Sequence, residues 1–202
     1  MELIDAIVYI NLEYRKDRRF QMEQEFTRMG IKGVKRFEAI SHKEGLIGCM
    51  QSHLAVLELA KKNGYKNILI FEDDFEFQVS KEELDLELRS VLGYGLAYDV
   101  LMLGYNMKKS APLASQKTIF KVLEAQTASA YIVHESFYNT LIKCYRDALP
   151  LLKETKLWDI YANDQVWKKL QPEAKWYAFT TRLGKQRESY SDTTRRVENY
   201  GV

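Results

Sequence analysis

The chain has 202 residues, 46% of them hydrophobic, which is enough to bury the core of one domain of ordinary size. Lys and Arg number 30 against 28 Asp and Glu, and the formal net charge of +2 does not favour a nucleic-acid-binding protein. No apolar run approaches the roughly 18 residues of a membrane span, and the N-terminus has no signal-peptide pattern. We therefore expect a single domain over residues 1–202, without a membrane span and located in the cytoplasm.

Strands and helices are expected to alternate along the first half of the chain. Apolar residues recur at helical spacing in three segments; Asp17 is a suitable cap for the first, and Ser80 and Glu83 have the spacing of a capping box before the third. Gly30 and Gly64 suit the left-handed position that ends a helix. The helices are therefore predicted over residues 17–30, 47–64 and 80–92, and the strands over residues 6–12, 34–39, 68–71 and 100–103.

The second half of the chain is predicted to hold shorter strands and two further helices. Residues 104–118 contain Gly, Asn, Pro, Ser and three lysines without periodicity, which predicts a mobile loop able to close over a ligand. Pro150 is expected to end the first of the two helices, and the chain from Arg182 onward is expected to be irregular. The strands are predicted over residues 119–122, 130–133 and 176–179, and the helices over residues 135–148 and 157–170.

The apolar run at residues 68–71 ends abruptly in three adjacent acids, Glu72, Asp73 and Asp74. Such a run predicts a buried strand of an α/β sheet, and ligands bind such sheets beyond the carboxyl ends of the strands. Three neighbouring carboxylates repel one another, so a bound cation is the simplest way to hold them, and oxygen ligands favour Mg²⁺ or Mn²⁺. The alternative is a strand that merely ends in a solvated acidic turn.

A fourth acid is predicted to point inward from the helix over residues 157–170. Asp164 follows Ile160 by four residues and precedes Trp167 by three, so it shares their apolar stripe, whereas Asp159 falls near the helix start, where an acid favours the helix dipole. An inward carboxylate without a partner is costly. Asp164 is therefore either paired with a cation in a structural role or placed in a pocket as a general base.

Five sequence segments occur in a recognisable order along the chain. They are Tyr-Ile-Asn-Leu at 9–12 with Arg15, Asp17 and Arg18, Gly-Cys-Met-Gln-Ser-His at 48–53, Glu-Asp-Asp at 72–74, Ala-Ser-Ala-Tyr-Ile-Val at 128–133, and Gly-Lys-Gln-Arg-Glu-Ser-Tyr-Ser-Asp at 184–192. With these segments in this order, the chain resembles glycosyltransferase family 25, which includes bacterial lipopolysaccharide sugar transferases, collagen galactosyltransferases and related enzymes of large DNA viruses. The resemblance spans nearly the whole sequence.

The resemblance implies a GT-A type fold, a single-domain nucleotide-sugar-binding α/β sandwich with a mostly parallel central sheet. It implies transfer of a sugar from a nucleoside diphosphate sugar, such as UDP-galactose or UDP-glucose, to an acceptor hydroxyl on a glycan, a lipid-linked glycan or a glycoprotein, with inversion. Mn²⁺ or Mg²⁺ on Glu72 and Asp74 would stabilise the departing diphosphate, and Asp164 would be the base. If the chain is virus-encoded, the host cytoplasm is its expected location.

The resemblance also implies a set of donor-binding residues, some of which have other readings. Arg15 and Arg18 could instead belong to a solvated helix start. The implied contacts to the donor come from Asn11, Leu12, Arg15, Arg18, Ser52, Asp73, Ser129, Gln186, Arg187, Tyr190 and Asp192.

Other residues near these segments are expected to be structural. His53 lies beside an apolar helix face and is expected to be a hydrogen-bonded core histidine rather than a metal ligand. Cys49 and Cys144 have no paired spacing, so neither a disulfide framework nor a zinc site is predicted. The three tryptophans are core or acceptor-platform residues, with the core favoured: Trp158, Trp167 and Trp176.

Two functions of other classes compete with a glycosyltransferase. A metal-dependent phosphatase or nucleotidyltransferase could also place acids at a strand end, but it should show a nucleophilic Asp motif or a Gly-Ser phosphate loop, and the sequence has neither. A catalytically silent nucleotide-sugar- or glycan-binding protein could keep the fold. The acid triplet together with an inward Asp164 argues against that reading.

Overall fold

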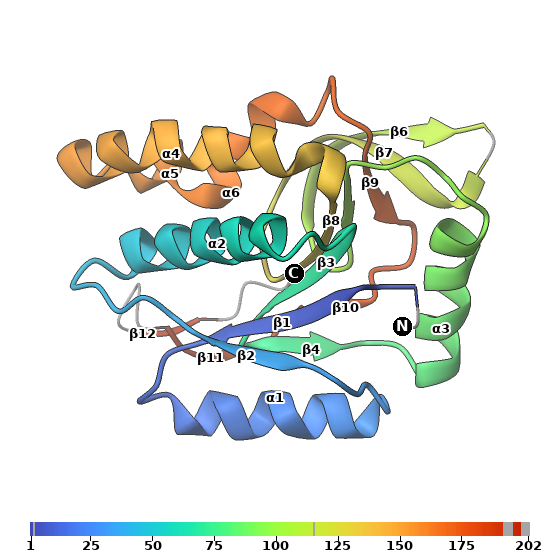
Figure 1. Ribbon diagram of the computed structural model, residues 1–202, viewed down its shortest axis with the longest axis horizontal. Coiled ribbons are helices and arrows are strands. Elements are labelled where there is room, and N and C mark those ends of the chain that lie inside the picture. Colours follow the sequence, from blue (N-terminus) through green and yellow to red (C-terminus); the bar gives the residue numbers. More distant parts are fainter. Residues whose placement is uncertain (2, 115, 192–195, 199–202) are drawn as a thin grey trace.

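The computed structural model describes residues 1, 3–114, 116–191 and 196–198, with only the backbone for residues 189–191 and 196–198. A mixed sheet lies between two layers of helices (Figure 1). Its strands are β1 (Ala6–Asn11), β2 (Lys35–Glu38), β3 (Asn67–Glu72), β5 (Val100–Met102), β6 (Asn106–Leu113), β7 (Gln116–Gln126), β8 (Ala130–His134) and β9 (Trp176–Phe179).

The eight strands are arranged in the order β2-β1-β3-β8-β5-β9-β7-β6. β7 and β8 are antiparallel to their neighbours, so the other six strands share one direction. This arrangement confirms the predicted α/β class with a mostly parallel central sheet. Two smaller pairs join β4 (Phe75–Phe77) to β10 (Gly184–Gln186) and β11 (Ser189–Ser191) to β12 (Arg196–Glu198).

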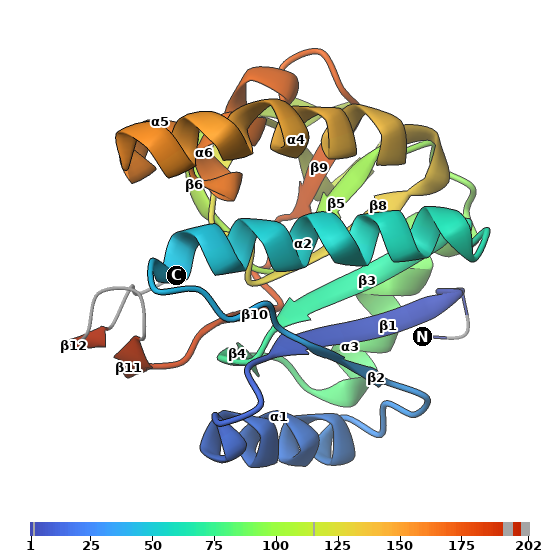
Figure 2. The same ribbon diagram turned by 60° about the vertical axis from the view of Figure 1, so that its left-hand side comes forward.

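Helices cover both faces of the sheet, as two views of the molecule show (Figures 1 and 2). α2 and α4 lie on one face, and α1 and α3 lie on the other. The helices are α1 (Lys16–Arg28), α2 (Gly45–Lys62), α3 (Lys81–Leu88), which continues as a π-helix at Arg89–Gly93, α4 (Tyr138–Thr155), α5 (Trp158–Tyr161) and α6 (Asn163–Val166), with 3-10 turns at Glu135–Phe137 and Trp167–Leu170.

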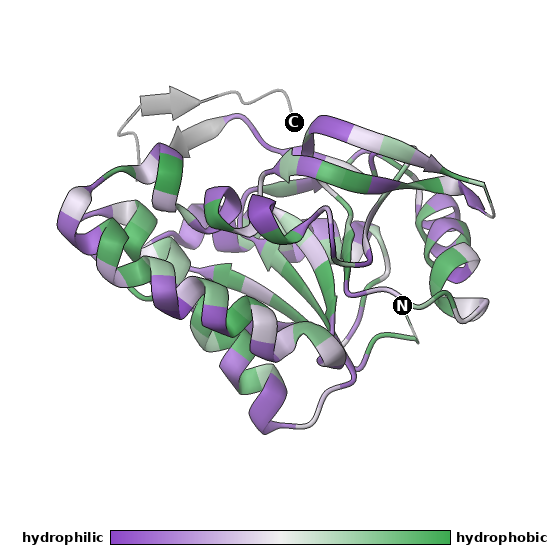
Figure 3. Ribbon diagram, turned by 90° about the horizontal axis from the view of Figure 1, so that it is seen from above, coloured by the Kyte–Doolittle hydropathy of each residue, from purple (hydrophilic) through white to green (hydrophobic). Residues whose placement is uncertain are grey.

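Each face of the sheet has its own hydrophobic core, because successive side chains of a strand point to opposite faces. In β1, Val8 and Ile10 join the core under α2 and α4, whereas Ile7 and Tyr9 join the core over α1 and α3. All six residues of β1 are therefore buried. In Figure 3 the central strands are coloured mostly as hydrophobic, whereas hydrophilic and hydrophobic colours alternate along the outer helices.

The carboxyl ends of β1 and β3 meet at one edge of the molecule. The two strands are parallel neighbours, with Ile10 opposite Glu72, so Asn11 at the end of β1 lies beside the acids that follow β3 (Figure 2). Such an edge is where α/β sheets bind ligands. The fold thus places the acid triplet where the sequence predicted it.

The predicted loop over residues 104–118 is wrong. Most of it forms β6 and the start of β7, an antiparallel pair that extends the sheet at its edge. The pairing contains register shifts between Met107 and Lys109 and between Pro112 and Leu113, which explains why no clean alternation marked it in the sequence. A ladder of this kind does not support the expected mobile lid.

The expectation that Pro150 ends a helix is also wrong, because α4 continues to Thr155 and ends at Lys156 in the left-handed conformation. Pro150 lies on the exposed side of α4, while Tyr145, Ala148 and Leu152 continue a buried stripe past it. Packing of this stripe outweighs the one hydrogen bond that proline cannot donate.

The predicted helix over residues 157–170 is broken into α5, α6 and a 3-10 turn. The break falls at Ala162, whose backbone is extended at φ −62° and ψ 157°. As a result the predicted apolar stripe is interrupted: Leu157 and Ile160 are 46% and 51% exposed, whereas Trp167 is fully buried.

The predictions about helix ends and the C-terminal segment are confirmed in part. Gly30 and Gly64 have positive φ, and Ser80 and Glu83 form the capping box, as predicted. Asp17 does not cap α1, since it lies in the first turn and pairs with Arg15. The chain after residue 182 is not wholly irregular, because it supplies β10, β11 and β12. In the described part of the chain, no helix is long and apolar enough to cross a bilayer.

Candidate functional site

The acid triplet is held at the end of β3 by the sheet on one side and by aromatic packing on the other. The backbone N–H of Glu72 donates to the carbonyl of Ser129, at 2.8 Å, which links the turn after β3 to the start of β8. Phe71 and Phe75 flank the acids and pack together in the core over α1 and α3, with ring centroids 5.1 Å apart. Glu72, Asp73 and Asp74 are therefore fixed in position.

Asp73 is hydrogen-bonded on both carboxylate oxygens. Asn11 Nδ2 donates to Oδ2 over 2.6 Å, and Arg18 donates to Oδ1 over 2.9 Å. The other side-chain atom of Asn11, the amide oxygen Oδ1, accepts a hydrogen bond from Arg36 Nε over 3.0 Å. Two predicted donor-binding residues, Asn11 and Arg18, thus meet the acid triplet, and Arg18 is not part of a solvated helix start.

Asp74 has one paired and one free carboxylate oxygen. Oδ2 lies 3.2 Å from the Arg18 guanidinium, whereas Oδ1 is buried and no described residue is in hydrogen-bonding geometry with it. Burial raises the pKa of Asp74 to about 7, and the charges of Glu72 and Asp73 act in the same direction against the opposing charge of Arg18. Ionisation of Asp74 is therefore disfavoured unless a further positive charge binds beside it.

Glu72 turns toward α2 and the C-terminal segment. Its Oε1 lies 3.1 Å from His53 Nε2 and accepts from the Cys49 thiol over 3.7 Å, and its Oε2 accepts from Gln186 Nε2 over 3.4 Å. Burial acts to raise the pKa of Glu72, but the hydrogen bonds of His53 and Cys49 and the charge of Arg18 lower it overall. Glu72 is thus held as a carboxylate.

Residues 48–53 lie in α2 and make different contacts on the two sides of this helix. A Cβ on Gly48 would come 2.4 Å from the carbonyl oxygen of Ile40, so only glycine allows the loop before α2 to pass there. Ser52 accepts from Ile40 N and donates to Gly48 O, which uses its hydroxyl within the protein. Cys49 and His53, four residues apart on the opposite side, face the acids.

Asp164 reaches the same site from α6. Its Oδ2 accepts from the backbone N–H of Thr127 over 3.0 Å, and its Oδ1 accepts from Gln165 Nε2 over 3.2 Å. Burial raises the pKa of Asp164, and the charge of Glu72 adds to this effect. The prediction of an inward carboxylate holds even though the predicted helix is broken. No ion pair of Asp164 occurs among residues 1, 3–114 and 116–188.

The other predicted donor-binding residues differ in whether they contact the acids. Arg15 is buried and pairs with Asp17 at 2.9 Å. Arg187 approaches the acids through its backbone, which donates to the Asp74 carbonyl, while its side chain lies 3.7 Å from Glu25. Leu12 is half-buried and its carbonyl accepts from Arg15. The side chain of Tyr190 and the whole of Asp192 lie outside the described residues.

The hydroxyl of Ser129 is buried, and within the described residues it has no hydrogen-bond partner. It lies against Gly104, where an added Cβ would come 2.8 Å from the Ser129 oxygen. The backbone carbonyl of Ser129 contacts Glu72, so the residue lies beside the acids, and its role in donor binding stays a prediction.

Only part of the tryptophan prediction is confirmed. Trp167 and Trp176 are fully buried and pack edge to face, with ring centroids 5.0 Å apart. Trp158 is not a core residue, since 60% of it is exposed on α5. The break at Ala162 explains the difference, because α5 no longer continues the buried stripe of α6.

Sequence reasoning missed the contact between His53 and the acids. His53 is hydrogen-bonded and fully buried, as predicted, but it joins Glu72 to the hydroxyl of Tyr131, which lies 2.7 Å from its Nδ1. The available signal was the i, i+4 spacing of Cys49 and His53 on one face of a helix. It could not show which strand that face would meet.

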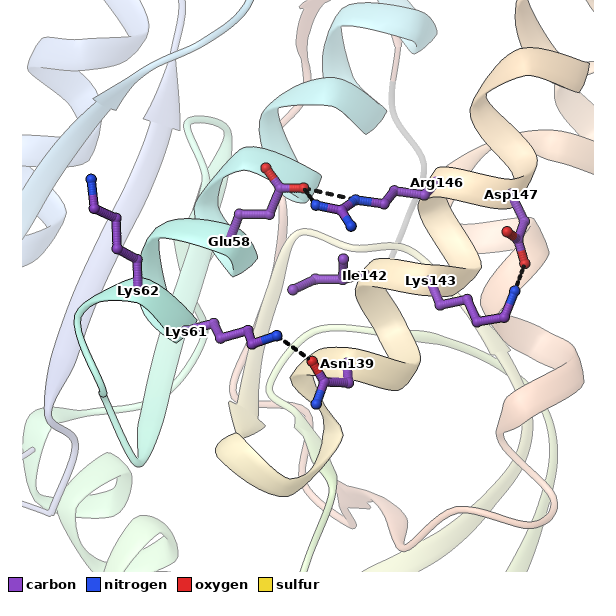
Figure 4. A pocket seen from close by; sticks show the side chains of 8 residues that line it. All are labelled: Glu58, Lys61, Lys62, Asn139, Ile142, Lys143, Arg146 and Asp147. Carbon is purple, nitrogen blue, oxygen red and sulfur yellow. Dashed lines mark hydrogen bonds and ion pairs between the residues drawn. The ribbon is translucent and has the colours of Figure 1, made fainter.

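A hollow of about 610 Å³ lies elsewhere, between α2 and α4 (Figure 4). Its polar side chains pair with one another: Arg146 Nη2 lies 2.6 Å from Glu58, and Lys61 donates to Asn139 over 2.6 Å. None of the site residues described above lines it. We therefore place the functional site at the acid triplet and not in this hollow.

Comparison with known proteins supports the family that the motifs indicated. The family model described as "Glycosyltransferase family 25 (LPS biosynthesis protein)" matches residues 43–140, a stretch that contains both the segment at residues 48–53 and the acid triplet. This match confirms the resemblance and identifies the chain as a glycosyltransferase. No curated protein matches the sequence.

Among solved structures, A197 from STIV has a TM-score of 0.48 at 12% identity, with 96% of this chain and 94% of that chain covered. A glycosyltransferase involved in glycosylation of the major capsid of PBCV-1 has a TM-score of 0.45 at 9% identity, covering 88% of this chain and 96% of that one. GlyE of Streptococcus pneumoniae TIGR4 has a TM-score of 0.44 at 8% identity, covering 87% and 45%.

Proposed function

We propose that this protein is a family 25 glycosyltransferase that transfers a sugar from a nucleoside diphosphate sugar to an acceptor hydroxyl, with a divalent cation at the acid triplet and Asp164 as base. The observation that carries the proposal is the buried Oδ1 of Asp74, which no residue in the described part of the chain hydrogen-bonds, beside two further acids. A buried carboxylate oxygen without a partner is costly, so a ligand is expected there.

A hard divalent cation fits this arrangement. Carboxylate oxygens are the ligands that Mn²⁺ and Mg²⁺ prefer. Asp74 Oδ1 is one such oxygen, and Glu72, whose side chain is 21% exposed, offers Oε2, which is held only by the long hydrogen bond of 3.4 Å from Gln186. Asp73 is less suited because Asn11 and Arg18 already occupy its two oxygens. The bound cation would neutralise the negative charge that the departing diphosphate develops.

The protein residues around the acids would orient the donor. Arg18 carries a positive charge between Asp73 and Asp74, where it can also meet a phosphate oxygen. Ser129 has a hydroxyl to donate or accept, and Gln186 reaches the same acids from β10. Asp73, fixed by Asn11, would face the ribose or the sugar. These roles follow the predicted donor-binding set in part only, since Ser52 uses its hydroxyl elsewhere.

Asp164 is suited to remove the acceptor proton. Burial raises its pKa, which makes the carboxylate a better base than an exposed aspartate. Its oxygens are oriented by the neutral donors of Thr127 and Gln165, so it is not tied up in an ion pair. A base placed on the far side of the anomeric carbon from the diphosphate would give inversion.

The resemblance supports a UDP-sugar, such as UDP-galactose or UDP-glucose, as donor and a glycan, lipid-linked glycan or glycoprotein as acceptor. Lipopolysaccharide biosynthesis and protein glycosylation are the corresponding processes. A catalytically silent sugar-nucleotide-binding protein is the alternative that shares this donor site.

The decisive experiment is a thermal-shift screen of nucleoside diphosphate sugars, each with and without Mn²⁺. A ligand that binds only the folded state raises the melting temperature by mass action. We expect one donor class to stabilise the parent protein in the presence of Mn²⁺ and to lose this effect in Asp74→Asn. Asp147→Asn, a change on the exposed side of α4, is the control and should behave as the parent does. No stabilisation by any donor would contradict the proposal.

A further inference from the structure

We propose that Cys49, His53 and Glu72 form a second cation site, selective for Zn²⁺ over Mn²⁺, next to the acid triplet. The thiol, the imidazole Nε2 and the carboxylate oxygen of these residues lie within 4.8 Å of one another. The site shares Glu72 with the proposed donor site, and only its effect on turnover rests on the proposed function.

The spacing of the three atoms suits tetrahedral zinc. Zinc bonds of about 2.0–2.1 Å to nitrogen, 2.0–2.2 Å to oxygen and 2.3 Å to sulfur place nitrogen and oxygen about 3.4 Å apart, and sulfur and oxygen about 3.6 Å apart, around a tetrahedron. The distances to Glu72 Oε1 are 3.1 Å from His53 Nε2 and 3.7 Å from Cys49 Sγ. Small movements would therefore admit the ion.

His53 is oriented as a zinc ligand would need to be. A ligating histidine usually holds its second ring nitrogen in a hydrogen bond, which fixes the ring and its tautomer. Nδ1 of His53 lies 2.7 Å from the Tyr131 hydroxyl, and the two rings stack with centroids 5.7 Å apart. The hydrogen bond that lowers the pKa of Glu72 is donated by Nε2–H of His53. Zinc binding would require the other tautomer, in which Nε2 has given up its proton and Nδ1–H donates to the Tyr131 hydroxyl, so that the lone pair of Nε2 is directed toward Cys49 and Glu72.

The ligand types decide which ion is preferred. Mn²⁺ and Mg²⁺ favour oxygen ligands, whereas thiolate and imidazole favour Zn²⁺. Binding requires that Cys49 give up its thiol proton to solvent, since the thiolate is the ligand. His53 is fully buried, but Glu72 and Cys49 are partly exposed and leave a path for the ion.

Zinc at this site would inhibit a donor site that needs Glu72. One carboxylate oxygen bound to Zn²⁺ is withdrawn from a cation at Asp74, and two divalent cations so close repel each other. We therefore expect Zn²⁺ to inhibit turnover at Mn²⁺ concentrations that otherwise support it. This inhibition should occur only in proteins that retain Cys49.

Cobalt provides the direct test, because Co²⁺ bound to thiolate gives a charge-transfer absorption in the near ultraviolet. Tag-free, reduced protein is titrated with Co²⁺ and then with Zn²⁺. We expect one equivalent of the band, its displacement by Zn²⁺, and its absence in Cys49→Ser. Cys144→Ser is the matched control: that buried thiol donates to the Val166 carbonyl, away from the acids, and its loss should leave the band unchanged.

Tyr131→Phe tests the geometry without removing a ligand. Loss of a hydrogen-bonding partner to a metal-bound histidine weakens binding by about 10- to 100-fold, so the Zn²⁺ affinity should fall by that factor while the band persists. Unchanged affinity in Tyr131→Phe would overturn the proposed geometry. A parent protein without the band, or a band that survives in folded Cys49→Ser, would overturn the site.

Inhibition of turnover by Zn²⁺ is an independent test of the site. Adding Zn²⁺ in the presence of Mn²⁺ should inhibit the parent and Cys144→Ser but not Cys49→Ser, each relative to its own zinc-free rate. Equal inhibition of all three proteins would overturn the shared role of Glu72. Because the cobalt band needs neither donor nor acceptor, failure of the proposed glycosyl transfer would leave the test of the zinc site intact.

Discussion

Asp164 is held by the backbone of Thr127, whose N–H donates to its carboxylate over 3.0 Å, and Thr127 keeps a φ of 81° to do so. A β-branched residue rarely adopts positive φ, and such strain of about 1–3 kcal/mol persists where the surrounding structure requires it. The result is a partly buried carboxylate oriented by a neutral donor. Asp164 can therefore accept a proton without first breaking an ion pair.

Asp164→Asn tests the role of this carboxylate. The amide oxygen can still accept from Thr127, so the fold and the affinity for donor and cation should remain close to those of the parent. The transfer rate should fall by roughly 10²- to 10⁴-fold, the usual contribution of a general base. Melting temperature, donor affinity and transfer rate are measured on one preparation.

Asp159→Asn serves as the control for Asp164, because Asp159 is an exposed acid on the neighbouring α5. It should transfer sugar at the parental rate. A large loss of melting temperature in Asp164→Asn, or an unchanged transfer rate, would remove Asp164 from the mechanism.

Asp74→Asn tests the cation. The amide is nearly isosteric, so the fold should be kept, but the charge that holds Mn²⁺ against the diphosphate is lost. We expect weaker Mn²⁺ binding by calorimetry and a strong fall in turnover. Parental turnover in protein treated with EDTA and then restored with Mn²⁺ would show that Asp74 is not a ligand.

The acid site was predictable because its parts are local. An apolar run followed by acids places a carboxylate group at the end of a buried strand, and β3 with Glu72 at its end has that arrangement. The inward position of Asp164 was also predicted, although for a reason that holds only in part, and its role as a base stays a prediction. Trp167 does lie on the buried side with it, but Ile160 is half exposed beyond the break at Ala162.

Features that depend on distant neighbours were not predictable. Nothing near residues 106–113 shows that β7 will pair with them, and the register shifts hide the alternation that a strand usually has. Pro150 stays within α4 because a buried stripe continues beyond it. The contact of His53 with Glu72 spans α2 and β3, and only the folded sheet brings the two together.

Arg18→Gln should destabilise the metal-free protein. The Arg18 guanidinium lies 2.9 Å from Asp73 and 3.2 Å from Asp74, and all three side chains are nearly buried. Removing this cationic partner leaves the buried carboxylates of Asp73 and Asp74 with much less compensation, which costs about 3–5 kcal/mol of unfolding free energy. Urea unfolding in EDTA measures it, and added Mn²⁺ should recover part of the loss.

Arg146→Gln is the matched control for Arg18, since Arg146 pairs with Glu58 at 2.6 Å on the surface. Exposed pairs contribute at most about 1 kcal/mol, so this variant should unfold nearly as the parent does. Equal losses in the two variants would mean that Arg18 does not stabilise the acids.

The stability of the metal-free protein should depend on pH through Asp74. Its carboxyl has an ordinary pKa of 3.8 in the unfolded chain and a pKa of about 7 in the fold, raised first by burial. Between these values the native state binds more protons than the unfolded state, so this group makes stability fall as pH rises from about 4 to about 7.

The variant Asp74→Asn tests this dependence, because the amide at position 74 cannot ionise. In EDTA, the melting temperature of the variant minus that of the parent should therefore rise across this range, and saturating Mn²⁺ should reverse the difference at pH 8 because the parent alone gains the cation. Parallel melting curves for the two proteins at every pH would show that Asp74 is not forced to ionise in a buried, uncompensated site.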